Sequence, residues 1–278
     1  MMRPFLSQVL DTLISVTQHG EGILMGVTDS RPIVLKDLDQ SVVSSCTESL
    51  ISLVKYISHT CNPEDLKVCV EHLLYVEQIN EYINLTRIVD LDDAIVLHIL
   101  DSLTLLPYVP SSSTYMLDMG TGPGFPGIPL AVICSLKADL LDSVGKKIKA
   151  VNAIVDALNI DGVRGVHARL EDHARTHRNA YDLVVARALA PLNVLLEYAS
   201  PLTAKEGHLI LSKGNLDDDE LNQGVDAAKQ CGFSLIEHNT FELPGDYGHR
   251  EILKFKKSHQ AALRLPRATG LARKNPLA

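Results

Sequence analysis

The spacing of apolar residues along the chain changes after a linker rich in proline and serine. Before it, within 63–108, apolar side chains recur every three or four positions over 66–79 and 94–103. This spacing predicts two amphipathic helices, the second capped by Asp90 or Asp92. Beyond the linker, apolar runs of strand length appear instead. These runs lie at 115–119, 139–141, 163–167, 182–186, 208–211, 233–236 and 251–255.

The segments between these runs predict how the strands are connected. The first five runs alternate with helical stretches at 128–136, 146–158 and 191–200, and such alternation is typical of βαβ units in a mainly parallel sheet. The last two runs are separated by Pro244-Gly245-Asp246, which suits a hairpin. We therefore expect an α/β fold with an antiparallel strand at or near one edge of the sheet.

Four parts are expected along the chain: an N-terminal extension of unknown role at 1–60, a helical cap at 61–110, an α/β domain at 114–258 and a basic tail at 259–278. Of the 278 residues, 46% are apolar and 22% charged, which suits a globular protein and excludes general disorder. No apolar run approaches the length of a membrane span, and polar residues interrupt the first twenty positions. We expect a cytoplasmic protein.

Cysteines and carboxylates predict no metal site. The five cysteines are odd in number, scattered and without C-x-x-C spacing, so we expect reduced thiols. The acidic run 217–220 lacks the glycine turn of a calcium loop and is expected to be a solvated loop.

The net charge of −8 conceals an asymmetry. From Arg250 to Ala278 there are eight Lys or Arg and one acid, while the preceding residues carry 18 basic and 33 acidic side chains. This is an acidic body with a basic tail. If the partner is a nucleic acid, the tail is the expected contact with its phosphates.

Residues 116–127, Met-Leu-Asp-Met-Gly-Thr-Gly-Pro-Gly-Phe-Pro-Gly, lead from a predicted strand through a glycine loop into a predicted helix. Gly120, Gly122 and Gly124 carry no side chain where the backbone would approach a ligand, and the helix N-terminus offers free N–H groups. A nucleotide-type ligand is therefore expected here. The other interpretation, a tight turn without a ligand, is disfavoured by three clustered glycines.

Two ligands are compatible with this loop. The spacing G-x-G-x-x-G at 122–127 is also found in NAD-binding folds. S-adenosylmethionine is favoured, because Asp118 would attract its ammonium group but repel a pyrophosphate. The chain is also short for a dehydrogenase with a separate substrate domain. Asp142, at the end of the second predicted strand, is placed to accept ribose hydroxyls in either case.

From about Tyr82 to Leu277 the chain resembles the RsmG family, also called GidB or glucose-inhibited division protein B. This family methylates N7 of a guanine in the 530 loop of bacterial 16S ribosomal RNA. The resemblance rests on several motifs in the family's order. They are Tyr82-Ile-Asn-Leu-Thr86, His98-Ile-Leu-Asp-Ser102, 118–129, Leu140-Leu-Asp-Ser143, Gly145-Lys-Lys147, Ala186-Arg-Ala188, Ser200-Pro-Leu202, Lys213-Gly214, Leu265-Pro-Arg267, Gly270 and Lys274-Asn-Pro-Leu277.

The resemblance implies a Rossmann-like class I S-adenosylmethionine-dependent methyltransferase, with a mainly parallel seven-stranded sheet and an N-terminal helical cap. It implies S-adenosylhomocysteine as the product and no metal. Gly120 and Phe125 match cofactor-contacting loop positions, and Leu170 and Glu171 match the pair beside the adenine. Arg187 matches an arginine at the cofactor and substrate side of the pocket.

The sequence departs from the family pattern in three places. Leu97 stands where many members carry a basic residue, so one RNA contact is absent or relocated. Ala186 replaces a common serine, which puts a hydroxyl contact there in doubt. The resemblance does not extend to the first sixty residues.

The residue types suit transfer to N7, which has a lone pair and no proton and so needs placement and exclusion of water rather than a general base. The motif that methyltransferases of exocyclic amines carry at the fourth strand is missing, since Val184-Val-Ala-Arg187 stands in its place. Cys134 lies inside a predicted helix, where a core thiol is expected rather than a nucleophile.

Three residues are candidates for the catalytic step. Arg187, at a strand end, would hold a phosphate or a guanine edge, or else form a surface ion pair. Lys213 follows the fifth predicted strand and would meet RNA. His98 lies on one helix face with Asp101. It either orients the cap over the pocket or is a core histidine hydrogen-bonded by a neighbouring carboxylate.

The expected partner is 16S ribosomal RNA or the small ribosomal subunit, bound by a monomer that contacts neither DNA nor membrane. An alternative is a non-catalytic nucleotide-binding regulatory or ribosome-assembly protein on a methyltransferase fold. A third interpretation is an NAD-dependent oxidoreductase. The glycine loop, Asp142 and Arg187 favour the methyltransferase over the non-catalytic alternative.

Overall fold

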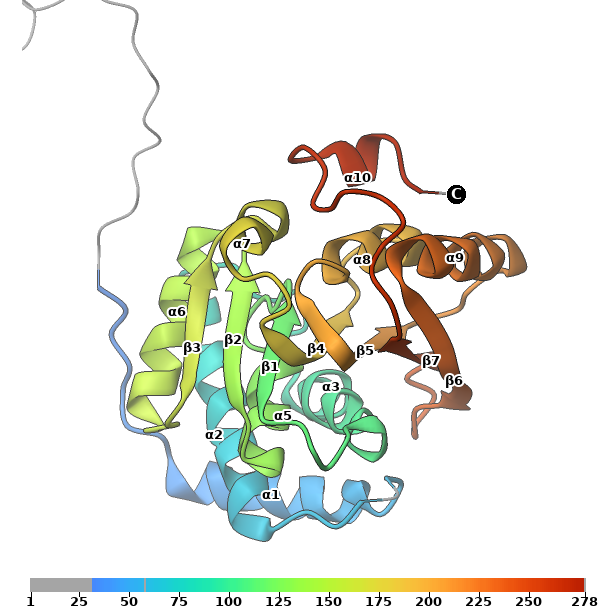
Figure 1. Ribbon diagram of the computed structural model, residues 1–278. Coiled ribbons are helices and arrows are strands. Elements are labelled where there is room, and N and C mark those ends of the chain that lie inside the picture. The colour runs from blue at the N-terminus through green and yellow to red at the C-terminus, as the bar shows by residue number, and fades with distance from the viewer. Residues whose placement is uncertain (1–31, 58, 278) are drawn as a thin grey trace, which may run out of the picture. The chain divides into compact units, whose positions relative to one another are not determined.

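The computed structural model describes residues 32–57 and 59–277. Much of the extension expected at 1–60, including its first twenty positions, lies outside the described residues. Seven strands form one sheet in the order β3-β2-β1-β4-β5-β7-β6 (Figure 1). The strands are β1 Tyr115–Met119, β2 Lys137–Asp142, β3 Val163–His167, β4 Tyr181–Arg187, β5 Thr203–Lys213, β6 Phe233–Glu242 and β7 His249–Lys257. Every apolar run that predicted a strand forms one.

The sheet is parallel from β1 to β5 and antiparallel beyond it. Strand β7 pairs antiparallel with both β5 and β6, and β6 is the edge strand. The segment Pro244-Gly245-Asp246 joins β6 to β7 as the predicted hairpin. The α/β class, the mainly parallel sheet and the antiparallel pair at one edge are confirmed.

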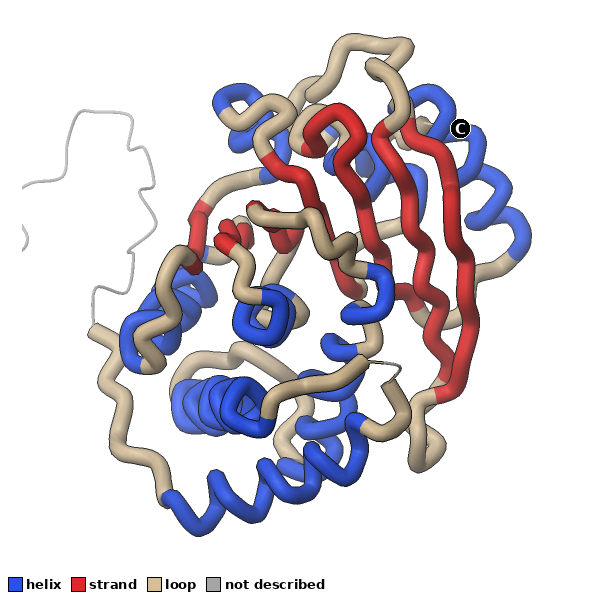
Figure 2. Tube along the Cα trace, turned by 60° about the horizontal axis from the view of Figure 1, so that its bottom comes forward, coloured by secondary structure: helices blue, strands red, loops and turns tan. Residues whose placement is uncertain are grey.

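Helices cover both faces of the sheet, as Figure 2 shows. The alternation of side chains along β1 fits this layering. Met116 packs into a core with α1, α2, α5 and α6, whereas Leu117 and Met119 pack into a core with α7, α8 and α9. The helices are α1 Gln40–Val54, α2 Pro63–Asn80, α3 Leu91–Ala94, the π-helix η1 Ile95–Leu100, α4 Asp101–Leu103, the 3-10 turn η2 Leu106–Tyr108, α5 Gly127–Cys134, α6 Gly145–Ala157, α7 Leu170–Thr176, α8 Leu192–Ala199, α9 Asp218–Cys231 and α10 Leu271–Lys274. Among the described helices, none is long and apolar enough to cross a membrane.

The N-terminal helices begin at side-chain caps. Asn62 caps α2, with Pro63 in its first turn, and Asp90 caps α3 by accepting a hydrogen bond from the Asp93 N–H. The two helices predicted within 63–108 and the Asp90 cap are confirmed. These helices share one apolar core with a face of the sheet, and the limits of the cap at 61–110 stay a prediction.

The expectation of a solvated loop at 217–220 is wrong. Asp217 is the N-cap of α9 and accepts a hydrogen bond from the Glu220 N–H, 2.7 Å away. The acids that suggested a loop form the first turn of the helix, where negative charge is favourable. Helices α1, α7 and α10 were also not predicted.

Candidate functional site

The glycine loop leaves β1 and crosses the carboxyl end of β2. The N–H groups of Gly120 and Thr121 donate to the Leu141 carbonyl at 2.8 and 3.0 Å. Gly120, Gly122 and Gly124 have φ of 76°, 59° and 106°, in the left-handed region that favours glycine. A Cβ at Gly122 would meet no protein atom within 4 Å, so the loop faces open space there.

Asp118 lies beneath this loop. Its Oδ2 accepts a hydrogen bond from the Gly127 N–H at 2.9 Å, and the residue is fully buried. Burial raises the pKa of Asp118 to about 6, although the neighbouring Thr121 and Gly127 groups oppose this. Among the described residues, neither Asp118 Oδ1 nor Thr121 Oγ1 has a partner in hydrogen-bonding geometry. Asp118 therefore holds the loop from below through the Gly127 N–H.

A pocket of about 260 Å³ opens at the carboxyl ends of β1, β2 and β3, where open α/β sheets bind ligands. We call it the strand-end pocket. Its lining is Gly120, Leu141, Asp142, Ser143, Ala168, Arg169, Leu170, Glu171, Leu189, Tyr198, Gly270 and Arg273. It brings together four residues predicted for the cofactor. They are Gly120, Asp142, Leu170 and Glu171. The other five predicted residues are not part of this lining. They are Asp118, Gly122, Gly124, Phe125 and Arg187.

Two carboxylates of the strand-end pocket are held by backbone groups. Asp142 accepts from the Gly122 N–H at 3.1 Å with Oδ2 and from the Val144 N–H at 2.8 Å with Oδ1. Glu171 accepts from the Gly270 N–H at 2.7 Å. Each carboxylate oxygen keeps further acceptor capacity for a ligand hydroxyl or amine.

The chain after β7 closes one side of the strand-end pocket. We call residues 263–277 the C-terminal strap; Figure 1 shows it passing over α8. The body holds the strap at both ends. Arg178 Nη1 donates to the Leu265 carbonyl, and Arg267 forms a two-pronged ion pair with Glu197. Further hydrogen bonds run from Thr269 Oγ1 to Asp172, from the Gly270 N–H to Glu171, from Arg273 to the Leu189 carbonyl and from Asn193 Nδ2 to the Leu277 carbonyl. Through the strap, Gly270 and Arg273 reach the pocket.

Sequence reasoning missed eight of the twelve residues that line the pocket, among them Leu189, Tyr198, Gly270 and Arg273. The charge of the C-terminal segment led to its interpretation as an RNA-binding tail, and no periodicity marked it as packed. A signal was present in Leu265-Pro-Arg267 and Gly270, which belong to the motifs of the resemblance. Family motifs so far along the chain from the glycine loop indicate that this segment packs against the rest of the protein.

A second cluster joins the glycine loop to the N-terminal helices. The Phe125 ring stacks between His72 and His98, with centroid distances of 4.2 and 4.8 Å. His72 Nε2 donates to the Pro123 carbonyl at 2.9 Å. Burial lowers the pKa of His72 to about 4 and that of His98 to about 3, with Arg187 adding to the latter shift. Both imidazoles are therefore neutral at pH 7.

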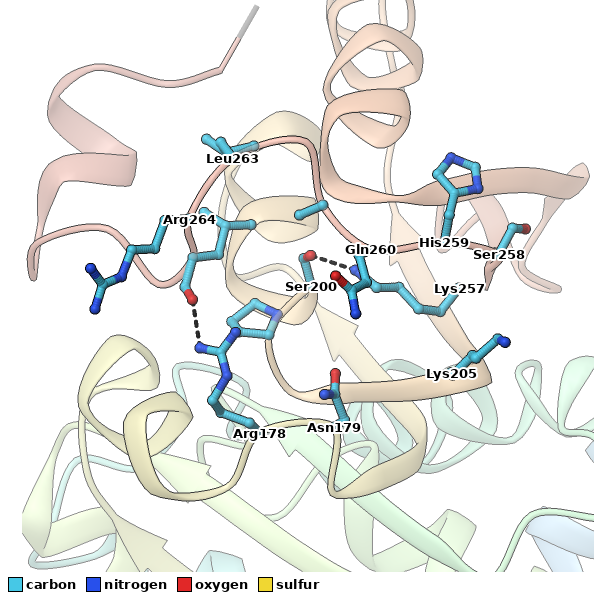
Figure 3. A pocket seen from close by; sticks show the side chains of 13 residues that line it. Arg178, Asn179, Ser200, Lys205, Lys257, Ser258, His259, Gln260, Leu263 and Arg264 are labelled. Carbon is cyan, nitrogen blue, oxygen red and sulfur yellow. Dashed lines mark hydrogen bonds between the residues drawn. The ribbon is translucent and has the colours of Figure 1, made fainter.

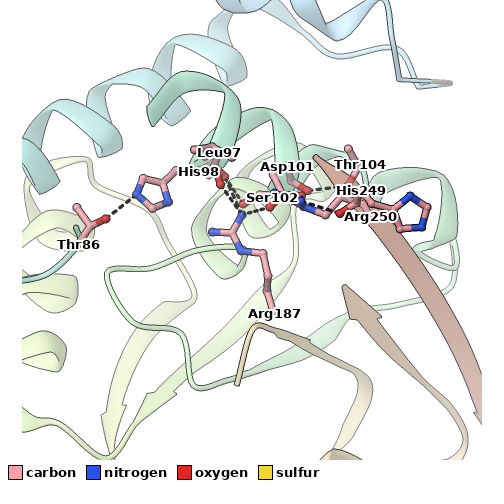
Figure 4. Close-up of polar contacts among 9 residues, drawn as sticks. All are labelled: Thr86, Leu97, His98, Asp101, Ser102, Thr104, Arg187, His249 and Arg250. Atoms are coloured by element: carbon pink, nitrogen blue, oxygen red, sulfur yellow. Dashed lines mark hydrogen bonds and ion pairs between the residues drawn. The ribbon is translucent and has the colours of Figure 1, made fainter. Parts of the chain in front are cut away.

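His98 does not contact the carboxylate that was expected on its helix face. Its Nε2 forms a hydrogen bond with Thr86 Oγ1 at 2.9 Å, as Figure 4 shows. Asp101 is engaged instead by Arg187 and Arg250, at 3.0 and 2.9 Å. The interpretation of His98 as a core histidine is thus wrong about its hydrogen-bond partner, which is the Thr86 hydroxyl and not a neighbouring carboxylate.

Arg187 links the end of β4 to the helical cap. Its Nη1 donates to the Leu97 carbonyl at 3.0 Å and to the His98 carbonyl at 3.3 Å, besides its ion pair with Asp101 (Figure 4). Its side chain is 13% exposed, so the interpretation as a surface ion pair is wrong. The guanidinium carbon lies 5.9 Å from the Phe125 ring centroid.

Lys213 is occupied by contacts within the protein. Its Nζ pairs with Glu220 at 2.7 Å and donates to the Ala190 carbonyl at 3.0 Å. These contacts fix the start of α9 and the segment before α8 against the end of β5. The side chain is 14% exposed.

Together, the strand order, the glycine loop after β1, the carboxylate that ends β2 and the strand-end pocket define a Rossmann-like methyltransferase of class I. A sequence model of GidB, rRNA small subunit methyltransferase G, matches residues 66–250. The chain belongs to this family.

Curated relatives agree with this assignment. The chain is 34% identical to ribosomal RNA small subunit methyltransferase G of Lactobacillus helveticus, over 73% of this chain and 87% of the relative. It is 38% identical to the protein of the same name from Carboxydothermus hydrogenoformans, over 71% and 86%. Among solved structures, precorrin-6y C5,15-methyltransferase of Geobacter metallireducens aligns with a TM-score of 0.46 and 16% identity, over 57% of this chain and 87% of that one.

Proposed function

We propose that this chain transfers a methyl group from S-adenosylmethionine to N7 of a guanine in the 530 loop of 16S ribosomal RNA. The observation that carries the proposal is the strand-end pocket, which gathers Gly120, Asp142, Leu170 and Glu171 at the carboxyl ends of the parallel strands. Membership of the GidB family supports the RNA substrate. The motifs of the resemblance support the guanine and its N7 atom.

The residues of the strand-end pocket fit S-adenosylmethionine. A Cβ at Gly120 would lie 2.5 Å from Leu189 Cδ1, so a side chain there would collide with another residue of the pocket lining. The apolar side chains of Leu141, Ala168 and Leu170 suit a flat adenine ring. We assign Asp142 to the ribose hydroxyls and Glu171, with Leu170, to the edge of the adenine.

The remaining predicted cofactor residues act through the loop. Gly122 and Gly124 let the backbone take its left-handed turns. Asp118 is fully buried, and we propose that it positions the loop in place of the ammonium contact first expected. Phe125, stacked between two histidines, fixes the far side of the loop against the cap.

When bound, the sulfonium supplies an activated methyl group, and N7 needs no proton removed. The protein's own contribution is therefore orientation and exclusion of water. Arg187 and His98 are assigned as positioning residues, because they join the end of β4, the glycine loop and the cap. Lys213 is assigned to the same class, because Glu220 and Ala190 already hold its ammonium group.

The partner in this proposal is the small ribosomal subunit or its RNA, in the cytoplasm. The proposal takes the protein as a monomer, with no DNA, membrane or metal involved. The described residues contain no group of three or more His, Cys, Asp or Glu side chains arranged to hold a metal ion.

Mass mapping of small-subunit RNA tests the proposal. In cells that lack this protein, the 530-loop guanine should lose its 7-methyl group, and expression of the wild-type chain should restore it, whereas the Asp142→Asn variant should not. Persistence of the 7-methyl group in cells that lack the protein would refute the proposal. If the purified protein binds the cofactor in calorimetry but never turns over on RNA, the non-catalytic alternative holds.

A further inference from the structure

A second pocket lies at the other end of the sheet, where β4 and β5 begin. It has a volume of about 630 Å³ and is formed by the turn before β4, the turn before β5 and the chain that follows β7. We call it the basic pocket. Its polar and charged lining consists of Arg178, Asn179, Ser200, Lys205, Lys257, Ser258, His259, Gln260 and Arg264 (Figure 3).

The charge of the basic pocket is of one sign. Four of its side chains are Lys or Arg, one is His, and no carboxylate is among the described residues that line it. This concentration stands out in a chain with a net charge of −8. Low-dielectric walls lined by one sign of charge attract ions of the other sign.

Lys257 is the buried member of this set. It is 5% exposed, and its Nζ donates to Ser200 Oγ and to the Cys231 carbonyl. Both partners are neutral, and the described part of the chain gives Lys257 no ion pair with a carboxylate. Burial lowers the pKa of Lys257 to about 8, and Arg178 adds to this by repulsion. The ammonium is thus mostly charged at pH 7 and lacks a counter-ion, which a buried charge ordinarily has.

The walls of the basic pocket are formed in advance. The Ser258 and His259 N–H groups donate to the Gly232 carbonyl at 3.0 and 3.2 Å, and the Asn179 N–H donates to the Pro201 carbonyl at 2.9 Å. In Figure 3 the side chains of Asn179 and Gln260 face each other across the opening, near Ser200. Amide, hydroxyl and cationic donors around one space suit the oxygens of a phosphate.

We propose that the basic pocket binds a phosphate group of the RNA backbone, at a site separate from the strand-end pocket. That the phosphate belongs to RNA rests on the proposed function. That the pocket binds a phosphate at all rests on the side chains that line it. The pocket gives an acidic protein a place to hold RNA at the end of the strands opposite the methyl-transfer site.

The test removes two cations at the rim of the basic pocket and compares this variant with a control variant of the same net charge. Lys205 and Arg264 line the pocket, and neither forms an ion pair within the described residues, so the double variant K205Q/R264Q should fold normally. The control is K67Q/K229Q, which removes a half-buried lysine on α2 and an exposed lysine on α9, each in an ion pair with a neighbour on its own helix. Calorimetry with pyrophosphate and binding of small-subunit RNA over a range of salt are then measured for both variants.

The pocket variant should lose about tenfold in pyrophosphate affinity, and its slope of log affinity for RNA against log salt should fall by about 1. The control should match wild type in both. Equal behaviour of the two variants, or no binding of pyrophosphate by wild type, would overturn the phosphate site. A loss for pyrophosphate without a loss for RNA would overturn the RNA assignment and indicate a free phosphorylated ligand.

Lys257→Met provides an independent readout. The Cys231 carbonyl keeps its hydrogen bond from the Ser200 hydroxyl, at 2.7 Å. Lys257 has no counter-ion among the described residues, although its Nζ lies 4.7 Å from the Phe233 ring centroid. An apolar side chain in its place should leave the melting temperature unchanged or raise it, while pyrophosphate binding is lost. A lower melting temperature with normal pyrophosphate affinity would mean that Lys257 serves the fold alone. Failure of wild type to methylate RNA, with pyrophosphate binding intact, would refute the proposed function and not the site.

Discussion

Asp142 is the residue on which the strand-end pocket depends most directly, since it holds the glycine loop and lines the pocket. Asp142→Asn should weaken binding of S-adenosylhomocysteine by about ten- to a hundredfold, because a charge-assisted hydrogen bond to the ribose is lost. Calorimetry measures this. The exposed Asp161→Asn is the control, and should bind as wild type does. Equal affinity of the two variants would refute the ribose contact.

Asp118 gives a pH-dependent prediction. Its pKa is raised to about 6 from the ordinary 3.8, so the folded protein keeps this proton where the unfolded chain loses it. The free energy of unfolding therefore falls as the pH rises from about 4 to about 6, by about 3 kcal/mol in all, because Asp118 ionises less readily in the folded protein. Asp118→Asn lacks this titration, and Asn Oδ1 still accepts from Gly127.

Urea unfolding of both proteins at pH 4.5 and 7 measures the effect. The stability of Asp118→Asn relative to wild type should improve as the pH rises. A constant difference between the two proteins would show that Asp118 does not titrate in this range.

Some pocket residues could be predicted from sequence for a physical reason. Gly120 and Asp142 follow predicted strands, and parallel strands bring their carboxyl ends to one edge. Tyr198 and Arg273 reach the same pocket from α8 and the C-terminal strap, where no local motif marks them. The buried role of Asp118 also could not be predicted, because sequence position does not tell which side of a loop a carboxylate faces.

Among the elements, the helical cap is joined to the sheet through Arg187. Removal of this side chain takes one donor from each of the Leu97 and His98 carbonyls, although Ser102 Oγ still donates to His98, and it leaves the Asp101 carboxylate with Arg250 alone. Arg187→Ala should lower the free energy of unfolding by about 3 kcal/mol, and methyl transfer should fall with it because the cap and loop lose their alignment. Arg175→Ala, at an exposed pair with Asp172, is the control. Normal stability in Arg187→Ala would contradict the linking role.

The C-terminal strap is fixed by the ion pair of Arg267 with Glu197, whose side chain is 3% exposed. Arg267→Ala leaves that carboxylate buried and unpaired, which should cost about 3 kcal/mol. Because the strap carries Gly270 and Arg273 into the strand-end pocket, affinity for S-adenosylhomocysteine should fall as well.

Thermal unfolding and calorimetry check this prediction. The exposed Lys274→Ala, on the same strap, should change neither quantity. If Arg267→Ala melts early but binds the cofactor normally, the strap is not a wall of the site.

Element prediction succeeded where apolar patterning decides structure. The runs in β1, β2, β4 and the second half of β5 are buried on both faces of the sheet, and buried parallel strands of this kind have nearly continuous apolar sequences. Helix α9 was missed because its four acids at 217–220 resemble a loop, although they cap and charge its first turn. Helices α7 and α10 are too short for a period to show.

At the scale of the whole molecule, the structure changes the meaning of the charge asymmetry. Half of the eight basic residues after 249 are in ion pairs with the body. They are Arg250 with Asp101, Lys254 with Glu237, Lys256 with Glu206 and Arg267 with Glu197. The segment consists of β7 and the strap, and it does not form a free basic tail. Positive charge available to RNA is therefore concentrated at particular sites, of which the basic pocket is one.

The most direct test of the central claim is transfer in a purified system. Wild-type protein, S-adenosylmethionine and small ribosomal subunits from cells lacking the modification are incubated, and the RNA is mapped by mass spectrometry. The account predicts one new methyl group, at N7 of a guanine in the 530 loop, and much slower transfer by Asp142→Asn when the cofactor is limiting. Methylation at another base, or no transfer by a protein that binds the cofactor, would contradict it.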